Sequence, residues 1–317
     1  MIEVSDAQRR AAFGAAYHML GSVADAEDIA QSAIERLLRL EPADRPRNPE
    51  AWLTTVATRL AVDELRSARA RREQYVGEWL PEPLVGGVLG EEPDATGHAE
   101  LAEELSFAFL VLLETLTPTE RAAFLLHDVL DYSYDEVAEV LDRPTSGAAR
   151  QLVSRARARV SGRVPRYPAT TAEQHELVSR FIAAVESGAV DGFVSLLTAD
   201  VTATGDGGGM VPPGFALTRS LHGADAVAKL LASFGRRAVF PMHVEARTVN
   251  GGPGVVMVAD LPVGGGVIAV MALDIRDGRI SAVHGVINPE KLRHLVPAFG
   301  PLADLDAVRE AEHSQRR

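Results

Sequence analysis

The chain has 317 residues, 46% of them hydrophobic, and a formal net charge of −12, and this length allows two or three compact domains with cores of their own. It contains no cysteine, which excludes disulfides, thiolate metal sites and cysteine nucleophiles. No apolar run reaches the roughly 18 residues of a membrane span, and the first residues lack the apolar stretch of a signal peptide, so we expect a cytoplasmic protein.

The first 72 residues are predicted to form a helical domain. Apolar residues recur at helical spacing from Asp25 to Arg39 and again from Pro49 to Leu65. Residues 41–49 separate the two helices, because their three prolines remove backbone donors and restrict the chain. Pro49 suits the first turn of the second helix, where its missing N–H is not needed.

Residues 73–99 are predicted to be a linker. They are rich in glycine, proline and acidic residues and show no sustained periodicity. A linker seldom contains tryptophan, however, and one lies within the string Trp79-Leu80-Pro81-Glu82-Pro83. We therefore expect this string to dock against another part of the protein.

Residues 100–166 return to helix with clear start signals. Thr117-Pro118-Thr119-Glu120 and Ser133-Tyr134-Asp135-Glu136 both have the form of a capping box. The helix after the second box ends before Pro144, and Thr145 or Ser146 then caps another helix that runs to about Val160. Two short helices joined by a tight turn predict a helix-turn-helix.

The last helix of this pair is strongly basic. Residues 143–166 contain seven arginines and no carboxylate, whereas residues 73–142 contain 17 acidic residues and one basic residue. Arginines on such a helix neutralise phosphates and reach base edges in the major groove. The alternative is a solvated basic helix paired with the acidic segment. In either case the polar residues face outward from the apolar side of the helix: Arg150, Gln151, Ser154 and Arg157.

The remainder of the chain is predicted to be a separate α+β domain over residues 170–295, followed by a tail over residues 296–317. Residues 173–198 have the pattern of two helices. Residues 239–287 alternate β-rich runs with turn signals such as Asp277-Gly278. Helices followed by an antiparallel meander are typical of this fold class.

A helix-turn-helix by itself fits repressors and activators equally well, but the amino-terminal part is more specific. It resembles the sigma factors of bacterial RNA polymerase, in the small extracytoplasmic-function class. The segment DAEDIAQ at 25–31 resembles region 2.2, which in that family grips the clamp helices of the largest polymerase subunit. Residues 48–53 and 59–66 resemble regions 2.3 to 2.4, which melt and read the minus-10 element. Residues 117–160 resemble region 4, which reads the minus-35 element.

The resemblance implies core RNA polymerase, through its clamp helices and flap, and promoter DNA as partners, with no membrane. The implied polymerase-binding residues are Asp25, Glu27, Asp28 and Gln31. The implied minus-10 residues are Arg45, Arg47, Asn48, Trp52, Arg59, Arg66 and Arg69. The implied minus-35 residues are Thr145, Ser146, Arg150, Gln151, Arg155 and Arg157. Structural interpretations stay open: Trp52 is favoured as a core anchor of its helix, and acids at a helix start favour the macrodipole.

The third domain resembles the SnoaL-like cone fused to one group of these sigma factors. Three motifs carry this resemblance: Trp79-Leu80-Pro81-Glu82-Pro83, Asp206-Gly207-Gly208-Gly209 and Asn288-Pro289-Glu290-Lys291-Leu292. Lysine usually follows the second motif, where this chain has Met210. The resemblance implies that the three motifs meet near one regulatory interface, that the cone regulates the sigma domains in cis, and that no separate anti-sigma factor is required.

The fold prediction is therefore multidomain: two all-α sigma domains, a region 2 bundle at 1–72 and a region 4 helix-turn-helix at 100–166, followed by an α+β SnoaL-like cone. Because such cones include enzymes, Asp206 is a candidate general acid or base, with His222, His243 or His284 as its partner. An aspartate before three glycines equally suits a tight loop. No metal-ligand spacing occurs, and we expect neither a cofactor nor catalysis.

Two further hypotheses follow from the fold. A small ligand within the cone is a hypothesis that rests on analogy with other proteins of this fold. For the whole chain, the alternative function is a helix-turn-helix repressor fused to a ligand-binding or enzymatic cone. The two functions differ in their partners, since a repressor binds duplex DNA tightly without RNA polymerase.

Overall fold

The computed structural model of the chain describes residues 4–72, 75–89, 105–160, 170–237 and 241–314. It divides into two units, the first made of residues 1–74 and 109–164 and the second of residues 75–108 and 165–317. The chain thus leaves the first unit, passes through the second, returns to the first and ends in the second.

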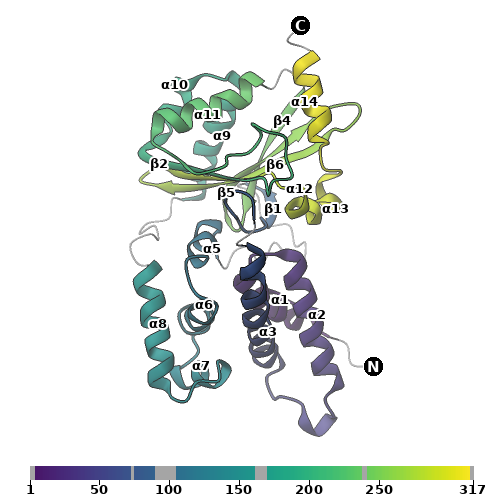
Figure 1. The fold of residues 1–317 in the computed structure, drawn as a ribbon, viewed down its shortest axis with the longest axis vertical. Coiled ribbons are helices and arrows are strands. Elements are labelled where there is room, and N and C mark those ends of the chain that lie inside the picture. The colour runs from purple at the N-terminus through teal and green to yellow at the C-terminus, as the bar shows by residue number, and fades with distance from the viewer. Residues whose placement is uncertain (1–3, 73–74, 90–104, 161–169, 238–240, 315–317) are drawn as a thin grey trace. The chain divides into compact units, whose positions relative to one another are not determined.

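The first unit begins with a three-helix bundle of α1 (Asp6–Leu20), α2 (Val23–Arg39) and α3 (Pro49–Arg72), with a 3-10 turn η1 (Pro42–Asp44) before α3 (Figure 1). Helix α1 starts at a capping box formed by Ser5 and Gln8 and ends at Gly21, whose φ of 65° is left-handed. Helix α1 packs against both other helices. The core of this bundle includes Tyr17, Leu20 and Leu53, each at most 1% exposed.

The rest of the first unit contains the helix-turn-helix. Its elements are α5 (Phe107–Leu113), whose first two residues belong to the second unit, α6 (Pro118–Phe124), a π turn η2 (Leu125–Val129), α7 (Tyr134–Val140) and α8 (Ser146–Val160). Both predicted capping boxes are confirmed, at Thr117 and at Ser133. The turn between α7 and α8 passes through Asp142, whose φ is 56°. The sequence signals were local, and the structure follows them closely.

The second unit is built on a seven-stranded sheet in the order β1-β4-β5-β6-β7-β2-β3. Strands β4 to β7 form the predicted antiparallel meander, whereas β2 joins β7 in parallel. Ile287 and Asn288 follow β7 directly, beside the end of β2. The strands are β1 (Val85–Val88), β2 (Leu197–Asp206), β3 (Leu221–His222), β4 (Met242–Val249), β5 (Gly252–Ala259), β6 (Gly266–Arg276) and β7 (Arg279–Val286).

Helices α9 (Thr171–Ser187), α10 (Val190–Val194) and α11 (Ala224–Arg237) cover one face of this sheet (Figure 1). Phe181 and Phe193 are fully buried in the core between them and meet edge to face, with ring centroids 5.6 Å apart. The fold is therefore an α+β domain, as predicted. The chain ends in α12 (Pro289–Leu292), a 3-10 turn η3 (Arg293–Leu295), α13 (Val296–Phe299) and α14 (Leu305–Ser314).

Two segments are more ordered in the structure than the sequence-based prediction of a linker and a tail. The predicted linker over 73–99 contributes Tyr75–Leu89 to the second unit, where β1 extends the sheet by pairing with β4. The predicted tail over 296–317 contributes Leu305 and Val308 to the core of that unit, and Val267 bridges to Leu302. Both segments gain their structure from partners far away in the chain, which local patterns do not reveal. Within the described residues, the structure has no helix with the length and apolar character needed to cross a membrane.

Candidate functional sites

Helix α8 presents a polar, arginine-rich face to solvent. Its buried residues are Ala149, Leu152, Val153, Ala156 and Val160. Arg150, Gln151 and Ser154 are exposed, as the sequence predicted. The hydroxyl of Thr145 accepts a hydrogen bond of 3.2 Å from the backbone N–H of Ala148, so Thr145 rather than Ser146 caps the helix. A helix with this outward face has the chemistry needed to enter a DNA groove.

Three arginines of α8 are paired with acidic residues that precede it in the chain. Arg155 and Arg159 lie 3.2 and 2.7 Å from carboxylate oxygens of Glu120. Arg157 donates two hydrogen bonds to Asp128, at 2.7 and 2.5 Å. The alternative interpretation, in which the basic helix pairs with the acidic segment, therefore describes this state of the protein. Binding of DNA phosphates by Arg155 and Arg157 would compete with these ion pairs.

The implied polymerase-binding residues lie on α2. Asp25 is half-buried in the first turn of this helix, and its backbone N–H donates to the capping hydroxyl of Ser22. Glu27, Asp28 and Gln31 are exposed on the same helix. An acidic helix start also suits the helix macrodipole, and this role is compatible with a partner contact.

The loop before α3 holds several of the implied minus-10 residues. Arg45 and Arg47 are exposed there. The side chain of Asn48 accepts a hydrogen bond of 3.1 Å from the backbone N–H of Ala51, so Asn48 caps α3. Trp52 is half-buried on the first turns of α3.

Arg59 does not point freely into solvent as a phosphate-binding side chain does. Its Nε donates to the backbone carbonyl of Val140 at 2.8 Å, and its NH2 donates to that of Glu139 at 2.9 Å. The guanidinium thus binds the C-terminal turn of α7, where the last carbonyls and the helix macrodipole favour a cation. Arg66 forms an exposed ion pair with Asp63, and the side chain of Arg69 lies outside the described residues.

Arg121 makes a second contact between the two helical segments of the first unit. It is 2% exposed, its Nε donates to the backbone carbonyl of His18 at 3.0 Å, and it pairs with Glu114. Burial, with a smaller effect from the charge of Arg121, lowers the pKa of His18 to about 4. His18 is therefore neutral at physiological pH. The sequence analysis did not single out Arg121, because nothing local distinguishes a buried arginine from an exposed one.

The three motifs of the third domain come together around Asp206, which is fully buried. One carboxylate oxygen accepts a hydrogen bond of 2.5 Å from the hydroxyl of Tyr75. The other accepts hydrogen bonds of 2.7 Å from the backbone N–H of Leu80 and from the ammonium group of Lys291. The Lys291 ammonium also donates to the carbonyl of Leu80. Burial and the hydrogen bond to Asp206 raise the pKa of Tyr75, which stays protonated.

We call this group the motif clasp and define it as Tyr75, Trp79, Leu80, Asp206, Asn288 and Lys291. The Lys291 ammonium lies 3.9 Å from the ring centroid of Trp79 and 5.0 Å from that of Tyr75, which explains the tryptophan in the predicted linker. Asn288 donates to the hydroxyl of Tyr75 at 2.9 Å and accepts from the backbone N–H of Glu290 at 3.0 Å. Tyr75 is the member that the sequence analysis missed.

The remaining residues of the motifs support the clasp. His294, just after the closing motif, lies 2.8 Å from the carbonyl of Pro83 through its Nε2, and Pro81 is buried. Leu292 is 1% exposed and Pro289 opens α12, whereas Glu82 is partly buried and Glu290 is exposed.

The glycines of the second motif allow the close approach. Gly208 and Gly209 have φ values of 57° and 71°, and a Cβ on Gly208 would lie 2.3 Å from the Asn288 side chain. Gly207 is equally constrained, since its Cβ would lie 2.6 Å from that of Ala216. Met210 is 57% exposed, so the residue that replaces the usual lysine contributes nothing to the clasp core.

The structure does not pair Asp206 with a histidine. His222 is exposed on β3, and His243 is bound to Asp260 and Glu245. His284 lies 3.0 Å from Asp274 instead. The candidate acid–base pairs of the sequence analysis are therefore not formed, because the three histidines lie on other strands or faces of the sheet. Among the described residues, no cluster of three or more metal-ligating side chains occurs.

Two helical segments, a helix-turn-helix with an arginine-rich second helix and a fused α+β domain define a DNA-binding protein of the transcription machinery. Residues 6–71 match the family model of Sigma-70 region 2, and residues 106–160 match that of Sigma-70, region 4. The chain is 41% identical over 301 residues to the ECF RNA polymerase sigma factor SigJ of Mycobacterium tuberculosis, with 92% of this chain and 93% of SigJ covered. The chain belongs to the extracytoplasmic-function family of RNA polymerase sigma factors.

Other comparisons agree with this family. The probable ECF RNA polymerase sigma factor SigI of Mycobacterium tuberculosis is 31% identical over 291 residues, which cover 90% of this chain and 92% of SigI. The crystal structure of Mycobacterium tuberculosis SigJ matches with a TM-score of 0.73 and 36% identity, and covers 91% of this chain and 96% of that one. The protein is thus a sigma factor that directs transcription, and the alternative of a helix-turn-helix repressor is set aside.

Proposed function

We propose that the second unit regulates this sigma factor in cis by holding the chain segment that connects regions 2 and 4. One observation carries the proposal. The region 2 match ends at residue 71 and the region 4 match begins at residue 106, and between them the motif clasp and β1 bind Tyr75–Leu89 to the second unit. The clasp therefore acts on the connection between the two promoter-reading regions.

The length of this connection matters because of the spacing of promoter elements. The minus-10 and minus-35 elements lie about 25 base pairs apart, or roughly 85 Å at about 3.4 Å per base pair. A free connection of 35 residues reaches at most roughly 120 Å, and each residue that the clasp holds shortens this reach. Release of the clasp would therefore favour engagement of both elements, and its closure would disfavour it.

Contacts between the two helical segments of the first unit support a closed resting state. Arg59 and Arg121 bind carbonyls of the opposite segment. Within the segment that holds the helix-turn-helix, Arg157 is paired with Asp128. We propose that promoter DNA competes for Arg59 and Arg157. The implied polymerase-binding residues on α2 and the implied minus-10 and minus-35 sets are proposed to serve those partners, in the cytoplasm where polymerase acts. A fused regulator of this kind works without a separate anti-sigma factor, and a small ligand of the cone is its proposed signal.

Transcription in vitro with core RNA polymerase tests the proposal. Lys291→Met removes the cation of the clasp, whereas Arg293→Met removes a cation whose side chain is 74% exposed nearby. We expect Lys291→Met to raise the yield of promoter-specific transcript several-fold over the full-length chain, and Arg293→Met to leave it unchanged. Equal transcript yields from folded Lys291→Met and the full-length chain would refute regulation through the clasp.

Point substitutions are preferable to truncation. A chain that ends near residue 297 loses Leu305 and Val308 from the core of the second unit, so it would confound regulation with unfolding. Binding of each variant to core polymerase is measured separately. It shows whether a change in transcript yield arises from polymerase binding or from a later step.

A further inference from the structure

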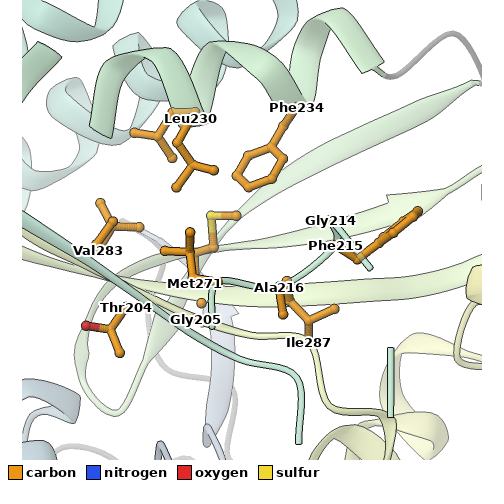
Figure 2. A pocket seen from close by; sticks show the side chains of 14 residues that line it. Thr204, Gly205, Gly214, Phe215, Ala216, Leu230, Phe234, Met271, Val283 and Ile287 are labelled. Carbon is orange, nitrogen blue, oxygen red and sulfur yellow. The ribbon is translucent and has the colours of Figure 1, made fainter. Parts of the chain in front are cut away.

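A small cavity of about 50 Å³ lies inside the second unit between α11 and the sheet. Figure 2 shows Leu230 and Phe234 of α11 extending toward Met271 of β6 and toward Ile287, which follows β7. The segment Gly214–Leu217, between β2 and β3, forms another wall. The cavity is therefore bounded by a helix, the sheet and a connecting segment of one unit.

The walls of the cavity are almost entirely apolar. The hydroxyl of Thr204 is the side-chain polar group among them, and it already hydrogen-bonds the hydroxyl of Ser220 at 3.0 Å. Protein interiors seldom leave space larger than one water molecule, and apolar cavities of this kind stay dry and take up apolar molecules. At about 10–15 Å³ for each water-sized group, the volume holds roughly four such groups. It fits a short aliphatic chain and offers nothing to a charged molecule.

The wall of the cavity continues directly into the motif clasp. Gly205 lines the cavity and precedes Asp206, and Ile287 lines it and precedes Asn288. The backbone N–H groups of Ile287 and Asn288 both donate to the carbonyl of Asp206, at 2.8 and 3.0 Å. A shift of either wall residue must therefore move the backbone that carries the Asp206 carboxylate or the Asn288 side chain.

The residues on either side of Asp206 are packed closely against the wall segment Gly214–Leu217. A Cβ on Gly205 would lie 3.1 Å from the backbone nitrogen of Leu217, another wall residue. Gly207, on the other side of Asp206, is similarly close to Ala216. The wall segment thus packs closely against both neighbours of Asp206, and a ligand that displaces this segment changes those contacts.

We propose that this cavity binds the aliphatic end of a small molecule and that its occupancy displaces the motif clasp. The regulatory consequence rests on the proposed cis control of the sigma regions, whereas binding and displacement do not. A ligand of about five heavy atoms is expected to bind with a dissociation constant in the millimolar range. Larger molecules with a polar group at the cavity mouth would bind more tightly.

Fluorescence of Trp79 reports on the clasp directly, because the Lys291 ammonium lies against its ring. The chain has two tryptophans, so Trp52→Phe, used only for fluorescence measurements, leaves Trp79 as the sole tryptophan. The full chain with this substitution is titrated with 1-butanol, and with the very polar glycerol as the comparison. We expect a saturable change of Trp79 emission with 1-butanol and none with glycerol.

Two matched substitutions locate the binding site. Leu230→Phe fills the cavity, whereas Leu261→Phe makes the same change at another half-buried leucine, which does not line it. Thermal unfolding establishes that both variants are folded. The response to 1-butanol should persist in Leu261→Phe and weaken at least tenfold in Leu230→Phe.

Three results would overturn the proposal: no saturable response, an equal response in Leu230→Phe, or binding seen by NMR without any change at Trp79. None of these measurements depends on transcription. The transcription test with Lys291→Met, in turn, needs no ligand in the cavity. Failure of the cavity proposal is thus distinguishable from failure of cis regulation.

Discussion

Replacement of Lys291 by methionine removes one partner of the buried ion pair in the motif clasp. Lys291 is 6% exposed and Asp206 is fully buried. The substitution leaves the Asp206 carboxylate buried with only the Tyr75 and Leu80 donors and leaves the carbonyl of Leu80 without the ammonium. Loss of one partner of a buried pair costs about 3–5 kcal/mol, because the other charge stays uncompensated in a low-dielectric interior.

Urea unfolding of the second unit measures this loss. In the Trp52→Phe background, emission from Trp79 reports the free energy of unfolding at the clasp itself. Arg293→Met is the matched control, since its exposed ion pair with Glu290 spans 3.9 Å and is worth at most about 1 kcal/mol. We expect Lys291→Met to lower the free energy of unfolding by about 3–5 kcal/mol and the control to lower it by less than about 1 kcal/mol.

A double substitution sharpens the test. Asp206→Asn removes the charge that Lys291→Met leaves uncompensated, so the double variant should be more stable than Lys291→Met alone. If Lys291→Met cost no more than Arg293→Met, or if the two clasp substitutions were additive, the ion pair would not stabilise the clasp.

Two further predictions concern the first unit, followed by the emission of Trp52 in a Trp79→Phe variant. The pKa of His18 is about 4 in the folded chain and 6.5 when unfolded, so below pH 6.5 the unfolded state binds the extra proton and stability falls until about pH 4. The full loss of free energy of unfolding is about 3 kcal/mol. Urea unfolding between pH 7 and pH 4.5 should show most of this loss. If His18→Gln had the same pH dependence as the parent chain, His18 would not be its cause. Arg59→Ala should cost about 1–2 kcal/mol and raise amide exchange in α7, since two hydrogen bonds from a charged donor are lost. Arg66→Ala, whose ion pair is exposed, should change neither the free energy of unfolding nor amide exchange in α7. Equal effects of Arg59→Ala and Arg66→Ala would refute the role of the contact between Arg59 and α7.

Local signals predicted the helical part of the protein well. Thr117 and Ser133 begin their helices as expected, because a capping box satisfies backbone donors within four residues of chain. The inward and outward faces of α8 follow from the spacing of Ala149, Val153 and Ala156. The order and spacing of the sequence motifs on these helices were enough to indicate the family.

Long-range partners were harder to predict. Strand β1 is short and glycine-rich, and only its pairing with β4, more than 150 residues away, makes it a strand. Strand β2 joins β7 in parallel, an arrangement that the meander pattern does not contain. The motifs themselves were recognisable, but Tyr75 carries no signal of its own, because its role depends on the buried carboxylate of Asp206.

The sequence by itself therefore determined the two helical sigma regions, the α+β class of the third domain and the identity of the three motifs, since each depends on neighbours within a few turns or strands of chain. Only the tertiary structure decided that Lys291, Trp79 and Asp206 share one site, that Arg59 binds the carbonyls at the end of α7, and that the clasp continues into an apolar cavity. The physical reason is that burial and ion pairing depend on which distant side chains meet, and a desolvated charge is stable only where its partner is present.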